Sequence, residues 1–365
     1  MSTTRKKNNI FKVILSGVTA AVIIAASAGC GTVDLTMGKN NKNSSDNSVV
    51  EVIMPAQTTT TVTTTAVTTE VPLPVKSYGD DFVRCNAAIC YDLTDGKVIY
   101  SKNAGKKVFP ASTTKILTAL TAIEYTAPEY EYYVGSELGL VAQDSSMSWI
   151  AEGSSLCRNE ILTAMLAPSG NDAAYTIAVN VARKLYGDDI SDNDAVAYFA
   201  VLMNDYAKKL GAKNTHFTVP DGYHDDEHYT TAEDMLKFAI AATQSQTICD
   251  ITCQPLAIVY DEQGNVHSWD NGNKLLTDTT IPYEVYGMKT GFTDEAGFCF
   301  IGYAGMNGKK ILTLVYGGEV ENRYADTKKL MDLGFDIYDE NHDYYTVEEL
   351  SLIHISEPTR LGMIS

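Results

Sequence analysis

The chain has 365 residues, of which 45% are hydrophobic, so it is long enough and apolar enough to bury a large core. Its 46 acidic side chains outnumber 28 basic ones and give a formal net charge of −18 at pH 7. This balance excludes nucleic acid as a partner and argues against attachment to anionic lipid by charge alone.

The amino terminus has the features of an export signal. An apolar run over 13–26, too short for a comfortable membrane span, follows four basic residues, Arg5, Lys6, Lys7 and Lys12. The run ends in Ser27-Ala28-Gly29-Cys30, which resembles a bacterial lipoprotein signal whose cysteine is lipidated. We expect residues 1–30 to be such a signal peptide, with an ordinary secretory signal as the alternative. Either predicts an exported protein, and a lipid on Cys30 would hold it at the outer face of the cell membrane.

Residues 31–75 are rich in Asn and Ser, then in Thr, and close with two prolines. A segment of this composition buries no core, so we expect a disordered tether. The folded domain is expected over residues 76–340.

Within that domain, strand-like runs lie at both ends and helical periodicity lies between them. Strands are predicted over 87–91, 97–100, 285–288, 298–303 and 310–316. Helices are predicted from Ser112 onward and over 158–167, 171–185, 194–210, 231–245 and 324–333. The order indicates an α+β fold: an antiparallel sheet built from both chain ends, helices on its faces, and a helical subdomain.

Residues 341–349 are expected to begin a further C-terminal region. Residues 350–360 look like a translated sequencing-library adapter, so we expect 350–365 to be an artefact rather than a natural tail.

Six cysteines follow Cys30, at spacings that define neither a disulfide framework nor a zinc motif: 85, 90, 157, 249, 253 and 299. Cys90 and Cys299 lie in apolar strand-like runs, so we expect unpaired core residues there.

The first chemical signal is the segment Phe109-Pro110-Ala111-Ser112-Thr113-Thr114-Lys115 at the start of a predicted helix. Ser112 would lie in the first turn, beside free backbone N–H groups, and Lys115 three residues on would share its face. A hydroxyl beside a base and beside oxyanion donors is what an activated serine needs. Taken alone the pair is a weak signal, because most such pairs are solvated surface.

Lys289-Thr290-Gly291 follows a predicted strand and is expected to lie at its end, with a turn at Gly291. The lysine can receive a substrate carboxylate, the threonine adds a hydroxyl, and the glycine allows a backbone to approach closely.

Ser169-Gly170-Asn171 is a polar break between two apolar helical segments, so its side chains are expected to face a cleft. Two other stretches also fit Ser-x-Asn: 45–47 in the expected tether, and 191–193 in an acidic stretch expected to be a solvated loop. We therefore choose Ser169 and Asn171.

Ser-x-x-Lys, Ser-x-Asn and Lys-Thr-Gly in this order resemble the serine penicillin-recognising enzymes, and above all the low-molecular-mass D-alanyl-D-alanine carboxypeptidases. The likeness covers about residues 76–340 and includes 214–217, 220–222, 228–232 and 291–297. It implies a β-lactamase/transpeptidase-like fold and a serine peptidase that removes the terminal D-alanine from peptidoglycan pentapeptide stems. It also implies covalent inhibition by β-lactam antibiotics and no cofactor.

The resemblance assigns catalytic roles to five residues. Ser112 would attack the carbonyl of the penultimate D-alanine, with Lys115 as the base, its pKa lowered by burial and by Lys289. Ser169 would relay a proton to the leaving group, and Asn171 would hold Lys115 and the substrate.

The resemblance also assigns substrate contacts. The backbone N–H groups of Ser112 and Phe292 would form the oxyanion hole, Thr290 and Gly291 would contact the substrate, and Arg323 would bind the terminal carboxylate.

Three alternatives to this interpretation have sequence features that can be checked. A class A β-lactamase would carry a Glu-x-x-Leu-Asn motif, and the sequence has none. A non-catalytic wall-peptide or β-lactam sensor would be expected to lack Ser112 or Lys115. His224 and His228, four residues apart among acidic residues, could suggest a metal, but the resemblance indicates a structured loop, so no metal is expected.

Overall fold

The computed structural model describes residues 78–79, 81–320 and 322–342. The expected signal peptide, tether and artefactual tail lie outside these residues, as does most of the expected 341–349 region. Within the described ranges, no helix combines the length and the hydropathy that a membrane span requires.

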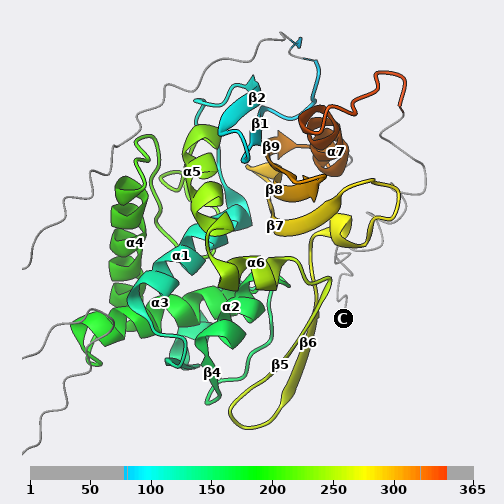
Figure 1. Cartoon of the computed structure of the whole chain (residues 1–365). Coiled ribbons are helices and arrows are strands. Elements are labelled where there is room, and N and C mark those ends of the chain that lie inside the picture. Colours follow the sequence, from blue (N-terminus) through cyan, green and yellow to red (C-terminus); the bar gives the residue numbers. More distant parts are fainter. Residues whose placement is uncertain (1–77, 80, 321, 343–365) are drawn as a thin grey trace, which may run out of the picture. The chain divides into compact units, whose positions relative to one another are not determined.

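A five-stranded antiparallel sheet joins the two ends of the domain (Figure 1). Its strands, in the spatial order β2-β1-β9-β8-β7, are β1 (Ala87–Asp92), β2 (Lys97–Lys102), β7 (Glu284–Thr293), β8 (Gly297–Met306) and β9 (Lys309–Gly318). The pairing of β1 with β9, in which Ala87 lies opposite Tyr316, connects the first strands to the last ones. The predicted sheet is therefore confirmed.

Helices cover both faces of this sheet. Helix α7 (Asn322–Gly334) packs against β1, β8 and β9, and α5 (Ala232–Thr243) packs against β1 and β9. Because both faces are covered, the middle of β8 is buried at every position, which explains its nearly continuous apolar sequence. Strand β7 stays at the edge of the sheet, so one side of its backbone is open to other parts of the chain.

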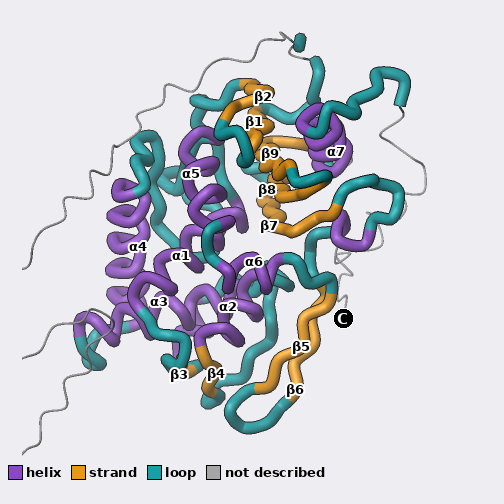
Figure 2. Tube along the Cα trace, in the orientation of Figure 1, coloured by secondary structure: helices purple, strands orange, loops and turns teal. Residues whose placement is uncertain are grey.

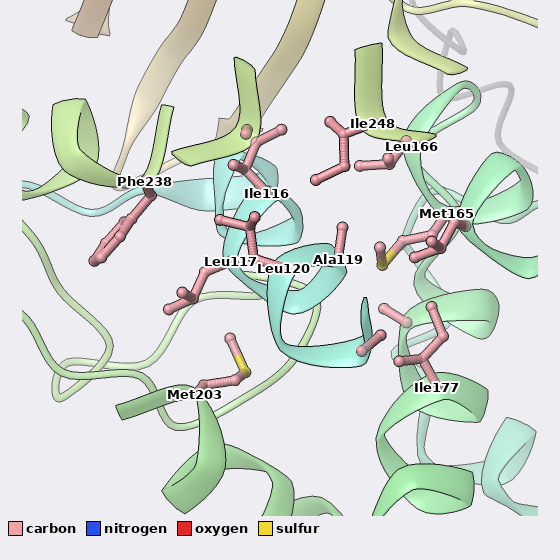
Figure 3. Close-up of a cluster of buried hydrophobic side chains, with 14 of the residues drawn as sticks. Ile116, Leu117, Ala119, Leu120, Met165, Leu166, Ile177, Met203, Phe238 and Ile248 are labelled. Atoms are coloured by element: carbon pink, nitrogen blue, oxygen red, sulfur yellow. The ribbon is translucent and has the colours of Figure 1, made fainter. Parts of the chain in front are cut away.

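Helix α1 (Lys115–Tyr125) forms the centre of the helical subdomain. Around it lie α2 (Arg158–Leu166), α3 (Asn171–Tyr186), α4 (Asp192–Lys209), α5 and α6 (Gln246–Thr252) (Figure 2). Figure 3 shows how Leu117 and its neighbours on α1 point toward buried side chains of these helices, among them Met165, Ile177, Met203 and Phe238. The observed helices α2 to α5 and α7 match the predicted ones to within about two residues at each end.

The start of α5 shows why these boundaries could be predicted. The side chain of Thr231 accepts a hydrogen bond from the backbone N–H of Asp234, as expected for a helix that begins after a threonine.

The prediction of a turn at Gly291 was wrong. Strand β7 continues to Thr293, so Lys289-Thr290-Gly291 lies inside the strand, and Gly291 is paired with Cys299 of β8. The apolar signal stops at Met288, but the ladder with β8 carries the strand through the polar motif. Two small antiparallel two-stranded sheets were also not predicted: β3 (Glu131–Tyr133) with β4 (Ser155–Cys157), and β5 (Leu256–Tyr260) with β6 (Val266–Asp270).

The six cysteines of the described residues are all free thiols. Cys90 and Cys299 are buried, so the expectation of unpaired core cysteines at these two positions is confirmed.

We predict that Leu117→Ala lowers the free energy of unfolding by about 2–5 kcal/mol, because it leaves a cavity at the centre of the helical subdomain. Leu185→Ala is the matched control, since that leucine is 42% exposed, and it should cost less than about 0.5 kcal/mol. Urea unfolding curves measure both values, and equal losses would contradict the packing described here.

Candidate active site

The nucleophile candidate lies in a short 3-10 helix, η1 (Ala111–Thr114), and not in the first turn of an α-helix as predicted. Helix α1 begins only at Lys115. Side chains three residues apart eclipse each other in 3-10 geometry. The Nζ atom of Lys115 accordingly lies 2.9 Å from the Oγ atom of Ser112.

The amine of Lys115 is fully buried and has two further partners. Its Nζ lies 2.7 Å from the Oδ1 atom of Asn171 and 2.7 Å from the carbonyl oxygen of Asp221. Burial lowers the pKa of Lys115 to about 8, although the carboxylates of Asp221 and Asp172 oppose the shift.

A charged Lys115 donates to three oxygens, those of Ser112, Asn171 and Asp221, and a neutral amine can keep two of these hydrogen bonds. The Asn171 and Asp221 oxygens can only accept hydrogen bonds, so they use both N–H groups of an uncharged Lys115. The remaining lone pair then faces the hydroxyl of Ser112, which is the arrangement of a general base and its nucleophile.

Gly222 packs the loop that contains Asp221 (the acceptor loop) against η1, the turn that carries Ser112. Gly222 has a φ of +84°, and a Cβ there would overlap the carbonyl oxygen of Ala111. Only glycine combines this backbone conformation with so close an approach. The contact keeps the neighbouring Asp221 carbonyl within reach of Lys115.

Strand β7 lies against the other side of the turn. A Cβ built on Gly291 would lie 3.0 Å from the backbone N of Ser112, so the edge of the sheet and η1 are in contact. An edge strand with free backbone groups can pair with an extended peptide. The motif therefore places a sheet edge beside the nucleophile candidate Ser112.

Lys289 points from β7 toward the same region and is 98% buried. Its Nζ donates a hydrogen bond to the carbonyl of Thr290 over 3.0 Å. Burial, together with repulsion from Lys115 and Arg323, holds the pKa of Lys289 well below its usual value. Three basic side chains thus converge here, and an anionic ligand would relieve their repulsion.

Arg323 occupies the second position of α7 and is 93% buried. The carbon of its guanidinium lies 4.9 Å from the ring centre of Phe298 and 4.7 Å from that of Tyr324. Its buried Nε atom has no hydrogen-bond partner among the residues that the structure describes. The aromatic rings therefore hold a cation that still has a donor to offer.

The Ser-x-Asn motif lies between α2 and α3, with Asn171 as the first residue of α3. Ser169 is buried and has a φ of +69°, a conformation that costs a residue with a side chain about 1–2 kcal/mol. The backbone N–H of Asn171 donates to the carbonyl of Ser146 over 2.8 Å. The structure thus joins Asn171 to Lys115, as the sequence predicted.

The alternative motif at 191–193 has a structural role. The side chain of Ser191 accepts a hydrogen bond from the backbone N–H of Asp194 and caps α4. Asp192 forms an ion pair with Arg183 at 2.6 Å. Asp192 and Asn193 belong to α4, so the prediction of a solvated loop was wrong at these two residues.

Sequence reasoning missed the support that His228 gives to the nucleophile turn. Its Nδ1 accepts the backbone N–H of Thr218 at 3.1 Å, so the proton on Nε2 is donated to the hydroxyl of Thr114 at 2.9 Å. Burial lowers the pKa of His228 to about 3. No group of three potential metal ligands occurs within the described part of the chain.

This chain is similar to a known protein family and to individual relatives within it. The profile of the D-alanyl-D-alanine carboxypeptidase family matches residues 75–320. D-alanyl-D-alanine carboxypeptidase DacF of Bacillus subtilis is 28% identical over 263 residues, or 71% of this chain and 64% of the relative. DacA of Escherichia coli is 27% identical over 75% of this chain and 65% of its own length. The chain thus spans less than two thirds of these two relatives.

The fold is also similar to those of solved structures. The crystal structure of the Streptomyces K15 DD-transpeptidase superposes with a TM-score of 0.64 and 26% identity, over 72% of this chain and 100% of that one. Penicillin-binding protein D2 of Listeria monocytogenes, solved with bound ampicillin, gives a TM-score of 0.57 and 30% identity, over 69% and 98%.

We predict that His228 makes the stability of the fold depend on pH. Its pKa is lower in the folded chain than the usual 6.5, so its contribution is complete above pH 6.5 and is lost as the pH falls toward 3. Between pH 6.5 and 4.5 the loss should be about 2 kcal/mol.

Chemical denaturation of the His228→Gln variant at both pH values should show a smaller loss than the wild type. His216→Gln is the control, because that histidine is exposed, and it should behave as the wild type does. Parallel losses in all three proteins would contradict the burial of an uncharged His228.

Proposed function

The chain belongs to the D-alanyl-D-alanine carboxypeptidase family, and on that premise we propose that it removes the terminal D-alanine from peptidoglycan stem peptides through an acyl-enzyme on Ser112. The observation that carries the proposal is the buried Lys115 amine, 2.9 Å from the Ser112 hydroxyl and bound to two carbonyl oxygens. The named relatives support the same activity.

In the proposed acylation, neutral Lys115 takes the hydroxyl proton of Ser112 as its Oγ atom attacks the carbonyl of the penultimate D-alanine. The backbone N–H groups of Ser112 and Phe292 stabilise the oxyanion. Ser169 relays the proton from Lys115 to the nitrogen of the leaving D-alanine, and Asn171 keeps Lys115 in position. The C–N bond breaks, and an ester to Ser112 remains, which water then hydrolyses.

The terminal carboxylate of the substrate is bound by the cations on the other side of Ser112. Lys289 and Arg323 supply positive charge, and Thr290 adds a hydroxyl while Gly291 leaves room for the substrate backbone. The pKa of Lys289 is lowered by burial and by repulsion from Lys115 and Arg323, and an incoming carboxylate relieves that repulsion. Binding therefore favours a peptide with a free terminal carboxylate over its amide.

A β-lactam carries a similar carboxylate and a reactive carbonyl, and the Listeria relative was solved with ampicillin. We infer that β-lactams acylate Ser112 as well. Because the sequence has no Glu-x-x-Leu-Asn motif to activate water, the penicilloyl ester should hydrolyse slowly and inhibit the enzyme.

The proposal is tested by release of D-alanine from diacetyl-L-lysyl-D-alanyl-D-alanine, from its C-terminal amide, and by turnover of benzylpenicillin. We expect cleavage of the acid only, and one penicilloyl group per chain, on Ser112 by mass spectrometry. Ser112→Ala should show neither. Labelling that survives this substitution would contradict the assignment, and rapid repeated penicillin hydrolysis would favour a β-lactamase.

A second prediction separates the two Ser-x-Asn motifs. Asn171→Ala should lower kcat by about a hundredfold or more, because it removes one of the acceptors that position the Lys115 amine. Asn193→Ala lies in α4 and should change kcat less than twofold. The opposite pattern would identify residues 191–193 as the functional motif.

We also propose that the enzyme acts outside the cytoplasm, anchored by a lipid on Cys30, with residues 31–75 as a tether to a catalytic domain over 76–340. The support is the sequence of the export signal. Cys30→Ser, expressed in a bacterial host with lipoprotein processing, should move the protein from the membrane fraction to the soluble exported fraction. A variant that stays in the membrane fraction would contradict the anchor.

A further inference from the structure

Three exposed aromatic side chains lie on segments that contact η1 (Ala111–Thr114) or the Ser-x-Asn motif, and the proposed mechanism uses none of their rings. Trp149, Tyr223 and Phe292 are 78%, 40% and 43% exposed. They belong to three separate segments: the loop before β4, the loop that contains Asp221, and strand β7. Exposed aromatic rings on segments that border a site are typical of binding surfaces.

Tyr223 and Phe292 lie next in sequence to residues that contact η1. Each directly follows a glycine that touches the catalytic turn, Gly222 at the carbonyl of Ala111 and Gly291 at the backbone N of Ser112. The two rings therefore belong to residues directly beside η1, one in the loop that contains Asp221 and the other in strand β7.

Trp149 is held at the site by a carboxylate. The Oδ1 atom of Asp172 accepts hydrogen bonds from the N–H and the hydroxyl of Ser148, at 2.9 and 2.7 Å. Its Oδ2 atom accepts the N–H of Ile150 at 3.2 Å. Asp172 directly follows Asn171, so these contacts fix Trp149 next to the Ser-x-Asn motif.

The backbone of Trp149 is strained by this arrangement. Its φ is +60°, in the left-handed region that bulky residues rarely adopt, and such a conformation persists only where the surroundings impose it. The Nε1 atom of Trp269 donates to the carbonyl of Ser148 at 2.8 Å and adds to the constraint. The surrounding contacts thus hold Trp149 in a strained backbone conformation in which its indole ring is exposed.

The other two rings are also held in place. The hydroxyl of Tyr223 donates to Asp144 at 3.2 Å, which joins its loop to the segment that carries Trp149. Phe292 packs on Phe298 with ring centres 4.4 Å apart. Side chains that are ordered before binding lose little entropy when a ligand arrives.

We propose that Trp149, Tyr223 and Phe292 form an aromatic entrance that binds the part of the stem peptide preceding D-alanyl-D-alanine. The inference rests on the proposed function. The catalytic groups engage the terminal dipeptide, and the three residues before it, when extended, reach about 10 Å from the site toward the segments that carry the rings. Flat apolar faces suit the hydrocarbon side chains and peptide planes of this segment.

The test compares two substrates that differ only in this segment: the pentapeptide L-alanyl-γ-D-glutamyl-L-lysyl-D-alanyl-D-alanine, and N-acetyl-D-alanyl-D-alanine. For Trp149→Ala, kcat/KM on the pentapeptide should fall about tenfold, mainly through KM. On the acetylated dipeptide it should change less than twofold. Trp149→Phe should keep most of the wild-type value, because a flat ring remains.

Tyr186→Ala is the matched control. This tyrosine is 51% exposed but ends α3, about 22 Å along the helix from Asn171. The Tyr186→Ala substitution should leave kcat/KM unchanged on both substrates.

Each other outcome has a defined meaning. Equal losses on both substrates would show a structural role for Trp149 and overturn the inference, as would unchanged kinetics on the pentapeptide. The same pentapeptide with a disaccharide attached serves as a third substrate. If Trp149→Ala lowers kcat/KM only on this third substrate, the rings bind sugar and the peptide assignment is overturned. A wild-type protein that cleaves neither substrate and forms no penicilloyl adduct would overturn the proposed function itself.

Discussion

The burial of the Lys115 amine is the constraint on which the rest of the site depends. A charged lysine without solvent is costly, and the protein responds by lowering its pKa to about 8, so that about a tenth of the molecules carry the neutral base at pH 7. Asn171 and Asp221 provide two acceptors, which are as many as an uncharged amine can satisfy. The lone pair is then left for Ser112. Desolvation, more than any nearby charge, thus lowers the pKa of Lys115 toward the value that its proposed role as general base requires.

This burial requires segments from the whole domain to meet at one turn. Helix α1 is surrounded by the helical subdomain and carries Lys115 at its first position, where η1 ends. The edge strand β7 approaches from the sheet, and close contacts at Gly222 and Gly291 remove the space that water would otherwise fill. His228 stabilises η1 through its hydrogen bond to the hydroxyl of Thr114. The site therefore lies where the sheet built from both chain ends joins the helices of the middle, and both lobes must fold to form it.

Much of this architecture could be predicted from local patterns. Short apolar, strand-like runs predicted the five strands of the sheet, and helical periodicity predicted the helices. The three polar motifs included Lys115, Asn171 and Lys289, which the structure brings close together. The failures share a physical cause. Gly291 stays in a strand because β8 pairs with it, and His228 meets Thr114 across 114 residues of sequence. The aromatic entrance likewise depends on a carboxylate, Asp172, that binds a loop more than 20 residues away. No local pattern encodes contacts of this range.

The most direct test of the account is the pH dependence of the second-order rate at which benzylpenicillin acylates the wild-type protein. In the proposed mechanism Lys115 acts only when neutral. Because its pKa is about 8, the rate should rise roughly tenfold per pH unit below 8 and level off above it. A rate that continues to rise toward pH 10.5, the usual pKa of lysine, or one that does not vary with pH, would contradict the claim that a buried, neutral Lys115 activates Ser112.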